Sequence, residues 1–186
     1  MKISLISSTG NLKTLDEMLE FGQKCARVCY TEKSWEELLD EPMNSQLLER
    51  LKTSGHHSVF EHMHLTFNFD GISKAFTMLF NNEKQYVTSE KSARYTVMSD
   101  IEPKRKKLFD EWKDILIPGI DEVYPLMDDS SARNTAIKKL AQENARYMTS
   151  VFTPTKLVHT INLRQLNFLQ DKFEDYVAKN IESTYY

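Results

Sequence analysis

Four of the five histidines lie close together, and three of them belong to one run, residues 55–62 (GHHSVFEH). These groups could bind a metal, bond to the nearby backbone, or face a planar ligand as hydrogen-bond donors. A metal would need His57 and Glu61 aligned on a helix, but Gly55 and the strand pattern that follows favour a loop. The His-Glu-x-x-His order of zinc proteases is also absent. We therefore expect a ligand-facing loop and no metal.

A second polar cluster occupies residues 89–94 (SEKSAR). Two serines, a lysine between them and an arginine just beyond form a compact anion site, because arginine offers paired donors to phosphate oxygens. The same residues are equally compatible with a solvated helix start that Ser89 caps. Neither serine is expected to act as a nucleophile, since no base is placed beside it.

A third candidate is Arg164, which follows an apolar run and opens a helix within residues 160–165 (TINLRQ). Its guanidinium could reach the same anion as Arg94, or it could simply lie at the surface. Each of the three signals is weak alone, so their value depends on the elements that position them.

The apolar pattern predicts an α+β fold, with few strands, many helices and no repeated strand-helix-strand rhythm. Apolar residues alternate over 63–69 and then recur every three or four residues over 72–80, which predicts a strand, a turn at Asp70-Gly71 and a helix. A further strand is expected over residues 2–7, and Thr153-Pro154-Thr155 is expected to interrupt the chain. Further helices are expected over 12–29, 44–53, 102–117 (which Pro118 kinks or ends), about 132–148 and 163–181.

Length and composition suit a single globular domain over residues 1–186. The formal net charge of −3 gives no reason to expect nucleic acid or an anionic membrane as a partner. No apolar run approaches the roughly 20 residues that a membrane span needs. Cys25 and Cys29 are expected to be reduced core residues, which suits a cytoplasmic protein.

Taken together and in order, these segments resemble the flavin-dependent thymidylate synthase family. The family's Gly-His-x-Ser/Thr-x-x-Glu-His loop corresponds to residues 55–62, and a strand and a Gly-x-Ser-Arg-like helix start (residues 71–74) follow. Ser92, Arg94 and Tyr95 match the end of the signature Arg-His-Arg-x-x-Ser-x-Asn-x-x-Ser-x-Arg and the residue after it. Residues 145–146 and 160–164 match the later Ala-Arg and Asn-x-Arg segments, so the resemblance covers about residues 12–169.

The departures from the family pattern concentrate on the flavin side. The Arg-His-Arg triplet stands here as residues 82–84 (NEK), and in the family this triplet helps to hold the flavin. Glu83 would direct a carboxylate at an anionic cofactor and repel it. Three further signature positions differ, namely Leu79, Val87 and Ser89, and the segment after Asn167 lacks the family's Ala-Gln-x-Glu-Ile-Arg run and is short. The nucleotide half of the site is kept and the flavin half is altered.

The resemblance implies a small mixed or antiparallel sheet flanked by helices, in a homotetramer whose active sites lie at subunit interfaces. The reaction it implies is the reductive methylation of dUMP to dTMP, with methylenetetrahydrofolate, FAD and NADPH and without a protein nucleophile. The residues implied to bind dUMP are Glu90, Ser92, Arg94 and Arg164. The residues implied to bind the cofactors are His56, Ser58, Glu61, Lys84 and Asn162.

Three functions stay open. The chain could be a divergent synthase in which Lys84 and its neighbours replace the triplet. It could be a degenerate dUMP-binding subunit that completes its flavin site with a homologous partner chain, in a hetero-oligomer. It could also be a non-catalytic nucleotide-binding homologue, or an enzyme that makes another 5-substituted pyrimidine. In each case we expect FAD binding that is weakened or depends on a partner.

Overall fold

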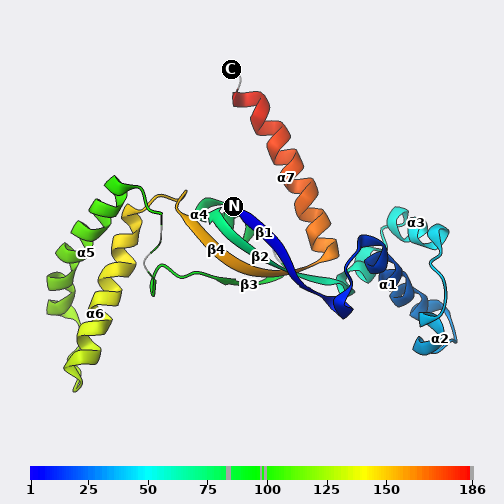
Figure 1. The fold of residues 1–186 in the computed structure, drawn as a ribbon, viewed down its shortest axis with the longest axis horizontal. Coiled ribbons are helices and arrows are strands. Elements are labelled where there is room, and N and C mark those ends of the chain that lie inside the picture. The colour runs from blue at the N-terminus through cyan, green and yellow to red at the C-terminus, as the bar shows by residue number, and fades with distance from the viewer. Residues whose placement is uncertain (83–84, 97, 99, 185–186) are drawn as a thin grey trace. The chain divides into compact units, whose positions relative to one another are not determined.

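The protein has an α+β fold, with helices and one four-stranded sheet in the strand order β1-β2-β4-β3 (Figure 1). The computed structural model describes residues 1–82, 85–96, 98 and 100–184. The strands are β1 (Lys2–Ser8), β2 (His64–Ser73), β3 (Tyr86–Glu90) and β4 (Pro154–Asn162). The expected α+β class with a small sheet is confirmed.

The chain divides into two compact units, and the strands contribute residues to both. The first unit comprises Met1–Ile3, Phe69–Asn82 and Ser89–Leu157. The second comprises Ser4–Asn68, Glu83–Thr88 and Val158–Tyr186. The expectation of a single domain stays a prediction.

The helices of the second unit begin at side-chain caps. Thr14 and Glu17 form a capping box at the start of α1, where the Thr14 hydroxyl accepts from the Glu17 N–H at 3.2 Å. Such a cap stabilises a helix by about 1 kcal/mol. The helical elements are α1 (Leu15–Arg27), α2 (Trp35–Leu39), α3 (Ser45–Thr53), α7 (Leu163–Thr184) and the 3-10 turns η1 (Thr9–Asn11), η2 (Val28–Tyr30) and η3 (His57–His62). Their core is the cluster Met18, Ala26, Leu48, Leu51, Val59, Phe60, Met63, Leu65 and Leu163.

The first unit contains a helical pair, α5 (Pro103–Val123) and α6 (Ser130–Ala145), which pack side by side (Figure 1). It also contains α4 (Lys74–Phe80) and the 3-10 turn η4 (Arg146–Met148). The buried apolar residues here are Phe69, Ile72, Phe80, Phe109, Ile137, Ala141, Ala145 and Leu157.

The strands expected over 2–7 and 63–69 and the helices expected over 12–29, 44–53, 72–80, 102–117, 132–148 and 163–181 are confirmed with shifted bounds. The predicted turn at Asp70-Gly71 is wrong, because β2 runs through it to Ser73. Gly71 has a φ of 73°, a conformation that glycine adopts without a Cβ clash, so the strand absorbs it and continues. The helix then begins at Lys74, where the Ser73 hydroxyl accepts from the Phe76 N–H at 3.1 Å.

Other expectations need correction. The helix does not end at Pro118, because α5 continues to Val123 and packs against α6, which outweighs the local cost of proline. The alternative of a kink at Pro118 stays a prediction. Thr153-Pro154-Thr155 does not interrupt the chain, since Pro154 begins β4, where a missing N–H is tolerated. The histidine run forms the 3-10 turn η3 and not an irregular loop. Both cysteines are free, but Cys25 is only half-buried and Cys29 is exposed, so neither is a core residue.

The buried His159 makes stability dependent on pH. Its side chain is 0% exposed on β4, its ring stacks on Tyr86 with centroids 4.9 Å apart, and burial lowers its pKa to about 4. In the unfolded chain a histidine titrates near ~6.5, so the unfolded state binds more protons between these values. The stabilisation is therefore complete above the unfolded pKa and is lost as the pH falls towards the folded pKa.

We expect the free energy of unfolding to fall by about 2 kcal/mol between about pH 7 and pH 5 because of His159 alone. Urea unfolding at both pH values measures it, in the wild type and in His159→Gln, where this part of the pH dependence should vanish. His64→Gln, at an exposed histidine, is the matched control and should keep the wild-type slope. Equal slopes in the wild type and His159→Gln would contradict the assignment.

Candidate functional site

A pocket of about 660 Å³ in the first unit contains two of the predicted dUMP-binding residues, Glu90 and Ser92. Lys74 of α4, Lys91 after β3 and Arg146 of η4 line the same pocket. A volume of this size suits a nucleotide, since ligand pockets in proteins span roughly 300–1,000 Å³.

Glu90 is fixed at the wall of this pocket. Its Oε1 accepts hydrogen bonds from Lys74 Nζ at 2.6 Å and from Thr77 Oγ1 at 3.1 Å. The Glu90 side chain is 14% exposed and Thr77 is fully buried, so the contact between these two residues is shielded from water, whereas the Lys74 side chain is 44% exposed. The carboxylate therefore holds the Lys74 ammonium at the pocket edge.

The segment after β3 forms a turn, which excludes the alternative of a helix capped by Ser89, since Ser89 is a strand residue. The Ser92 hydroxyl accepts from the Arg94 N–H at 3.2 Å. Gln142 Nε2 of α6 donates to the carbonyl oxygens of Ala93 at 3.0 Å and Arg94 at 3.3 Å. Helix α6 thus holds the turn that presents Ser92 and Arg94.

A charge cluster borders the pocket. Glu143 of α6 pairs through Oε2 with Arg94 Nε at 2.9 Å, and its Oε1 lies 3.9 Å from Arg146 Nη2. Three cations, Lys74, Lys91 and Arg146, line the pocket with one carboxylate, Glu90, which leaves two positive charges in excess. The ion pair between Arg94 and Glu143 adds one charge of each sign beside it. Such an excess favours a ligand with a phosphate dianion.

Four residues of this site, Lys74, Gln142, Glu143 and Arg146, were not predicted from the sequence. Arg146 belongs to the matched Ala-Arg segment and Lys74 to the matched helix start, so each carried a signal that was not used. Gln142 and Glu143 carried none, because their role depends on how α6 packs against the turn.

Arg164 lies in a different pocket, of about 580 Å³, in the second unit. Its guanidinium forms an ion pair with Glu61, another predicted site residue, across 103 positions of sequence. His57 lines this pocket and its Nε2 lies 3.0 Å from the carbonyl oxygen of Lys52. The apolar walls are Leu15, Leu19, Phe60, Leu163 and Phe168, and Asn167 and Asp171 add polar groups.

The remaining predicted residues are separated. His56 lines a third pocket and Ser58 is exposed on η3. Asn162 is buried, and its Oδ1 accepts from the Gln165 N–H at 2.8 Å at the start of α7. Lys84 lies outside the described residues. Arg94 belongs to the first unit and Arg164 to the second, so their convergence on one anion stays a prediction.

Within the part of the chain that the structure describes, no group of three histidine, cysteine, aspartate or glutamate side chains is placed to hold a metal ion. Within the same residues, no helix has the length and apolar character to cross a membrane.

The sequence and the fold of this chain are similar to those of known proteins. A family model described as thymidylate synthase complementing protein matches residues 12–179. The flavin-dependent thymidylate synthase of Pyrococcus furiosus is 26% identical over 148 residues, which cover 74% of this chain and 57% of that protein. The enzyme of the same name from Geobacter sulfurreducens is 26% identical over 181 residues, covering 89% of this chain and 70% of that protein.

Solved structures show the same fold. Thymidylate synthase X from Helicobacter pylori, determined with FAD and dUMP, matches with a TM-score of 0.50 at 18% identity, over 89% of this chain and 80% of that one. A UMP/dUMP methylase, PolB from Streptomyces cacaoi, bound with 5-Br dUMP, matches with a TM-score of 0.53 at 19% identity, over 89% and 74%.

The α+β fold around one small sheet is the class of structure that these solved proteins share with the chain. The match over residues 12–179 goes further: the chain belongs to the thymidylate synthase complementing protein family, as the resemblance predicted. The chain spans 57% of the length of its Pyrococcus relatives.

Proposed function

We propose that this chain binds dUMP in the first-unit pocket and takes part in its reductive methylation to dTMP, as a flavin-dependent thymidylate synthase. The observation that supports this most is the pocket itself. It brings Glu90 and Ser92 together beside Arg94, with an excess of positive charge and the volume of a nucleotide. Relatives that carry the name flavin-dependent thymidylate synthase support the same proposal.

Different side chains of the pocket would contact different parts of dUMP. The Ser92 hydroxyl and the Arg94 and Arg146 guanidinium groups donate to the phosphate, which competes with Glu143 for the two arginines. Lys74, held by Glu90, offers a further ammonium to the nucleotide. The pyrimidine ring is thereby oriented for a reaction that uses no protein nucleophile.

The second-unit pocket fits the flavin ring of FAD, because its apolar walls suit a planar ring and its polar groups suit the ring's edge. His57 and Asn167 are the residues that would hold FAD there, and the ion pair of Glu61 with Arg164 lies at the same pocket. FAD, when bound, carries the hydride. Methylenetetrahydrofolate and NADPH are the proposed co-substrates. We further propose a homo-oligomer, a tetramer by resemblance, in the cytoplasm.

One feature supports a second candidate, a dUMP-binding subunit that needs a related partner chain for its flavin. Residues 82–84 replace the family's Arg-His-Arg with Asn, Glu and Lys, which alters the flavin half while the dUMP pocket is kept.

Two measurements on the purified chain test the proposal. Calorimetry should detect dUMP binding, and dTMP should form when methylenetetrahydrofolate, FAD and NADPH are added. Binding of dUMP without turnover, followed by turnover when a related chain is added, would support the second candidate. Failure to bind dUMP would contradict both. The same assays with UMP test whether the nucleotide specificity extends to the ribose form.

The hydroxyl of Ser92 provides a more local test. We expect Ser92→Ala to weaken dUMP binding about 5- to 10-fold, because one neutral hydrogen bond contributes about 1 kcal/mol. Calorimetry measures this, with Ser89→Ala on the neighbouring strand as the control, since Ser89 does not line the pocket. An equal effect of the two substitutions would contradict the assignment of Ser92.

A further inference from the structure

A second basic cavity, of about 720 Å³, lies in the second unit. Of its lining residues, only His56 was assigned to a site from the sequence. The charged residues that line it are Arg27, Lys33 and Arg50 as cations and Glu41 as the carboxylate. Its volume again suits a ligand of nucleotide size.

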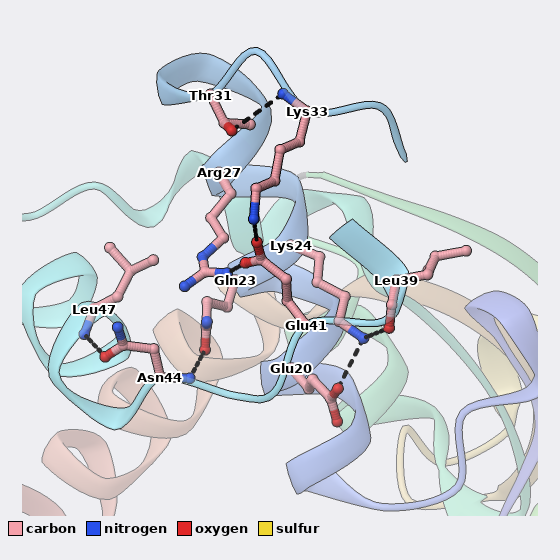
Figure 2. Close-up of polar contacts among 10 residues, drawn as sticks. All are labelled: Glu20, Gln23, Lys24, Arg27, Thr31, Lys33, Leu39, Glu41, Asn44 and Leu47. Atoms are coloured by element: carbon pink, nitrogen blue, oxygen red, sulfur yellow. Dashed lines mark hydrogen bonds and ion pairs between the residues drawn. The ribbon is translucent and has the colours of Figure 1, made fainter. Parts of the chain in front are cut away.

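The charges in this cavity favour an anion. Glu41 forms ion pairs with both Arg27 and Lys33, which approach it from the end of α1 and the loop after η2 (Figure 2). One carboxylate between two cations leaves a positive charge in excess, and Arg50 of α3 adds a second. Among residues 1–82, 85–96, 98 and 100–184, no ion pair of Arg50 is seen.

The polypeptide around the cavity is held in place before any ligand binds. The buried Gln23 accepts at Oε1 from the Asn44 N–H at 2.9 Å, and Asn44 Oδ1 accepts from the Leu47 N–H at 3.0 Å (Figure 2). Lys24 Nζ donates to the Leu39 carbonyl oxygen at 2.8 Å. These bonds fix the loop between α2 and α3, and with it the carboxylate that spaces the two cations.

The stability of the unit does not explain this concentration of charge. Partly exposed ion pairs typically contribute only about 0–1 kcal/mol. The cavity also has an apolar side, with the buried Leu38 and Leu51 beside Leu47, and a Tyr30 that is 76% exposed. Guanidinium groups match phosphate oxygens, and a free aromatic ring beside apolar groups matches a planar base.

We propose that this cavity binds a nucleoside diphosphate group, the group that FAD and NADPH have in common and that free ADP also carries. This inference rests on the proposed function only where it names FAD and NADPH as sources of that group. The cavity residues Arg27, Lys33 and Arg50 would then supply cations that residues 82–84 of this chain no longer supply.

The test is calorimetric titration of the full chain with ADP, in the presence of excess dUMP. We expect ADP to bind, and Arg50→Ala to weaken it about 10-fold or more, because a charge-assisted contact contributes about 1.5–3 kcal/mol. Lys33→Ala should weaken it less, since this ammonium is 54% exposed and already pairs with Glu41. Circular dichroism checks folding, and Arg50→Gln replaces Arg50→Ala if the alanine variant does not fold.

Two controls separate this site from the dUMP pocket. Lys104→Ala makes the same charge change on an exposed residue of α5 and should leave ADP binding unchanged, and so should a higher concentration of dUMP. No ADP binding, or an unchanged affinity in both Arg50→Ala and Lys33→Ala, would overturn the proposal. So would ADP binding that is lost as the concentration of dUMP is raised, which would place ADP in the dUMP pocket.

Competition then identifies the source of the diphosphate. Displacement of ADP by FAD or by NADPH supports the site and assigns it to that cofactor, and ADP that neither displaces supports a site for free nucleotide. A failure of dUMP to bind would refute the proposed function and leave the ADP titration interpretable.

Discussion

Replacing Arg94 by alanine is expected to weaken dUMP binding about 10- to 100-fold, since a charge-assisted contact to phosphate contributes about 1.5–3 kcal/mol. Arg94 Nε already pairs with Glu143 at 2.9 Å, so the Nη groups are the donors that the phosphate would meet. The side chain is 53% exposed and the turn is held through backbone atoms, so the substitution should not disturb the fold. Calorimetry with dUMP measures the change.

Two variants make this result specific. Arg105→Ala removes the same charge from an exposed position on α5 and should leave dUMP affinity unchanged. Arg94→Lys keeps the charge but loses the paired donors, so an intermediate affinity is expected. An undiminished affinity in Arg94→Ala would show that the first-unit pocket does not hold the phosphate.

Helices and strands could be predicted from the sequence where their apolar residues recur regularly. Alternation in residues 63–69 predicted most of β2, because one face of that strand is buried. In β4 the residues Thr155, Leu157, His159 and Ile161 are buried in alternation, yet the strand was missed. Because two of these four residues are polar and Pro154 precedes them, the sequence does not show the apolar alternation that is typical of a half-buried strand.

The site shows a different limit. The residue types that bind phosphate, such as Ser92 and Arg94, can be chosen from local sequence and from a motif. Their partners cannot, because Glu143 and Gln142 reach the turn only once α6 packs beside it. The ion pair between Glu61 and Arg164 joins two residues that were singled out separately, and only the fold brings them together.

The flavin half of the site leads to the last expected result, that this chain alone binds FAD about two to four decades more weakly than an ordinary family member. Two of the three basic positions of the triplet are lost at Asn82 and Glu83. Each charge-assisted contact to phosphate contributes about 1.5–3 kcal/mol, and about 1.4 kcal/mol corresponds to one decade of affinity. The Glu83 carboxylate adds repulsion, which solvent and Lys84 partly screen.

Restoring the triplet should reverse this loss. The double variant Asn82→Arg/Glu83→His is expected to tighten FAD binding by about two to four decades, measured by flavin absorbance near ~450 nm and by fluorescence titration. Glu83→Gln is the matched control, because it removes the repulsion without adding a donor cation, and its gain should be much smaller. Tight FAD binding by the unaltered chain, or a double variant no better than Glu83→Gln, would show that the altered triplet does not limit flavin binding. In that case cations of the second unit, such as Arg27, Lys33 and Arg50, would have to make the phosphate contacts that the triplet makes in the family.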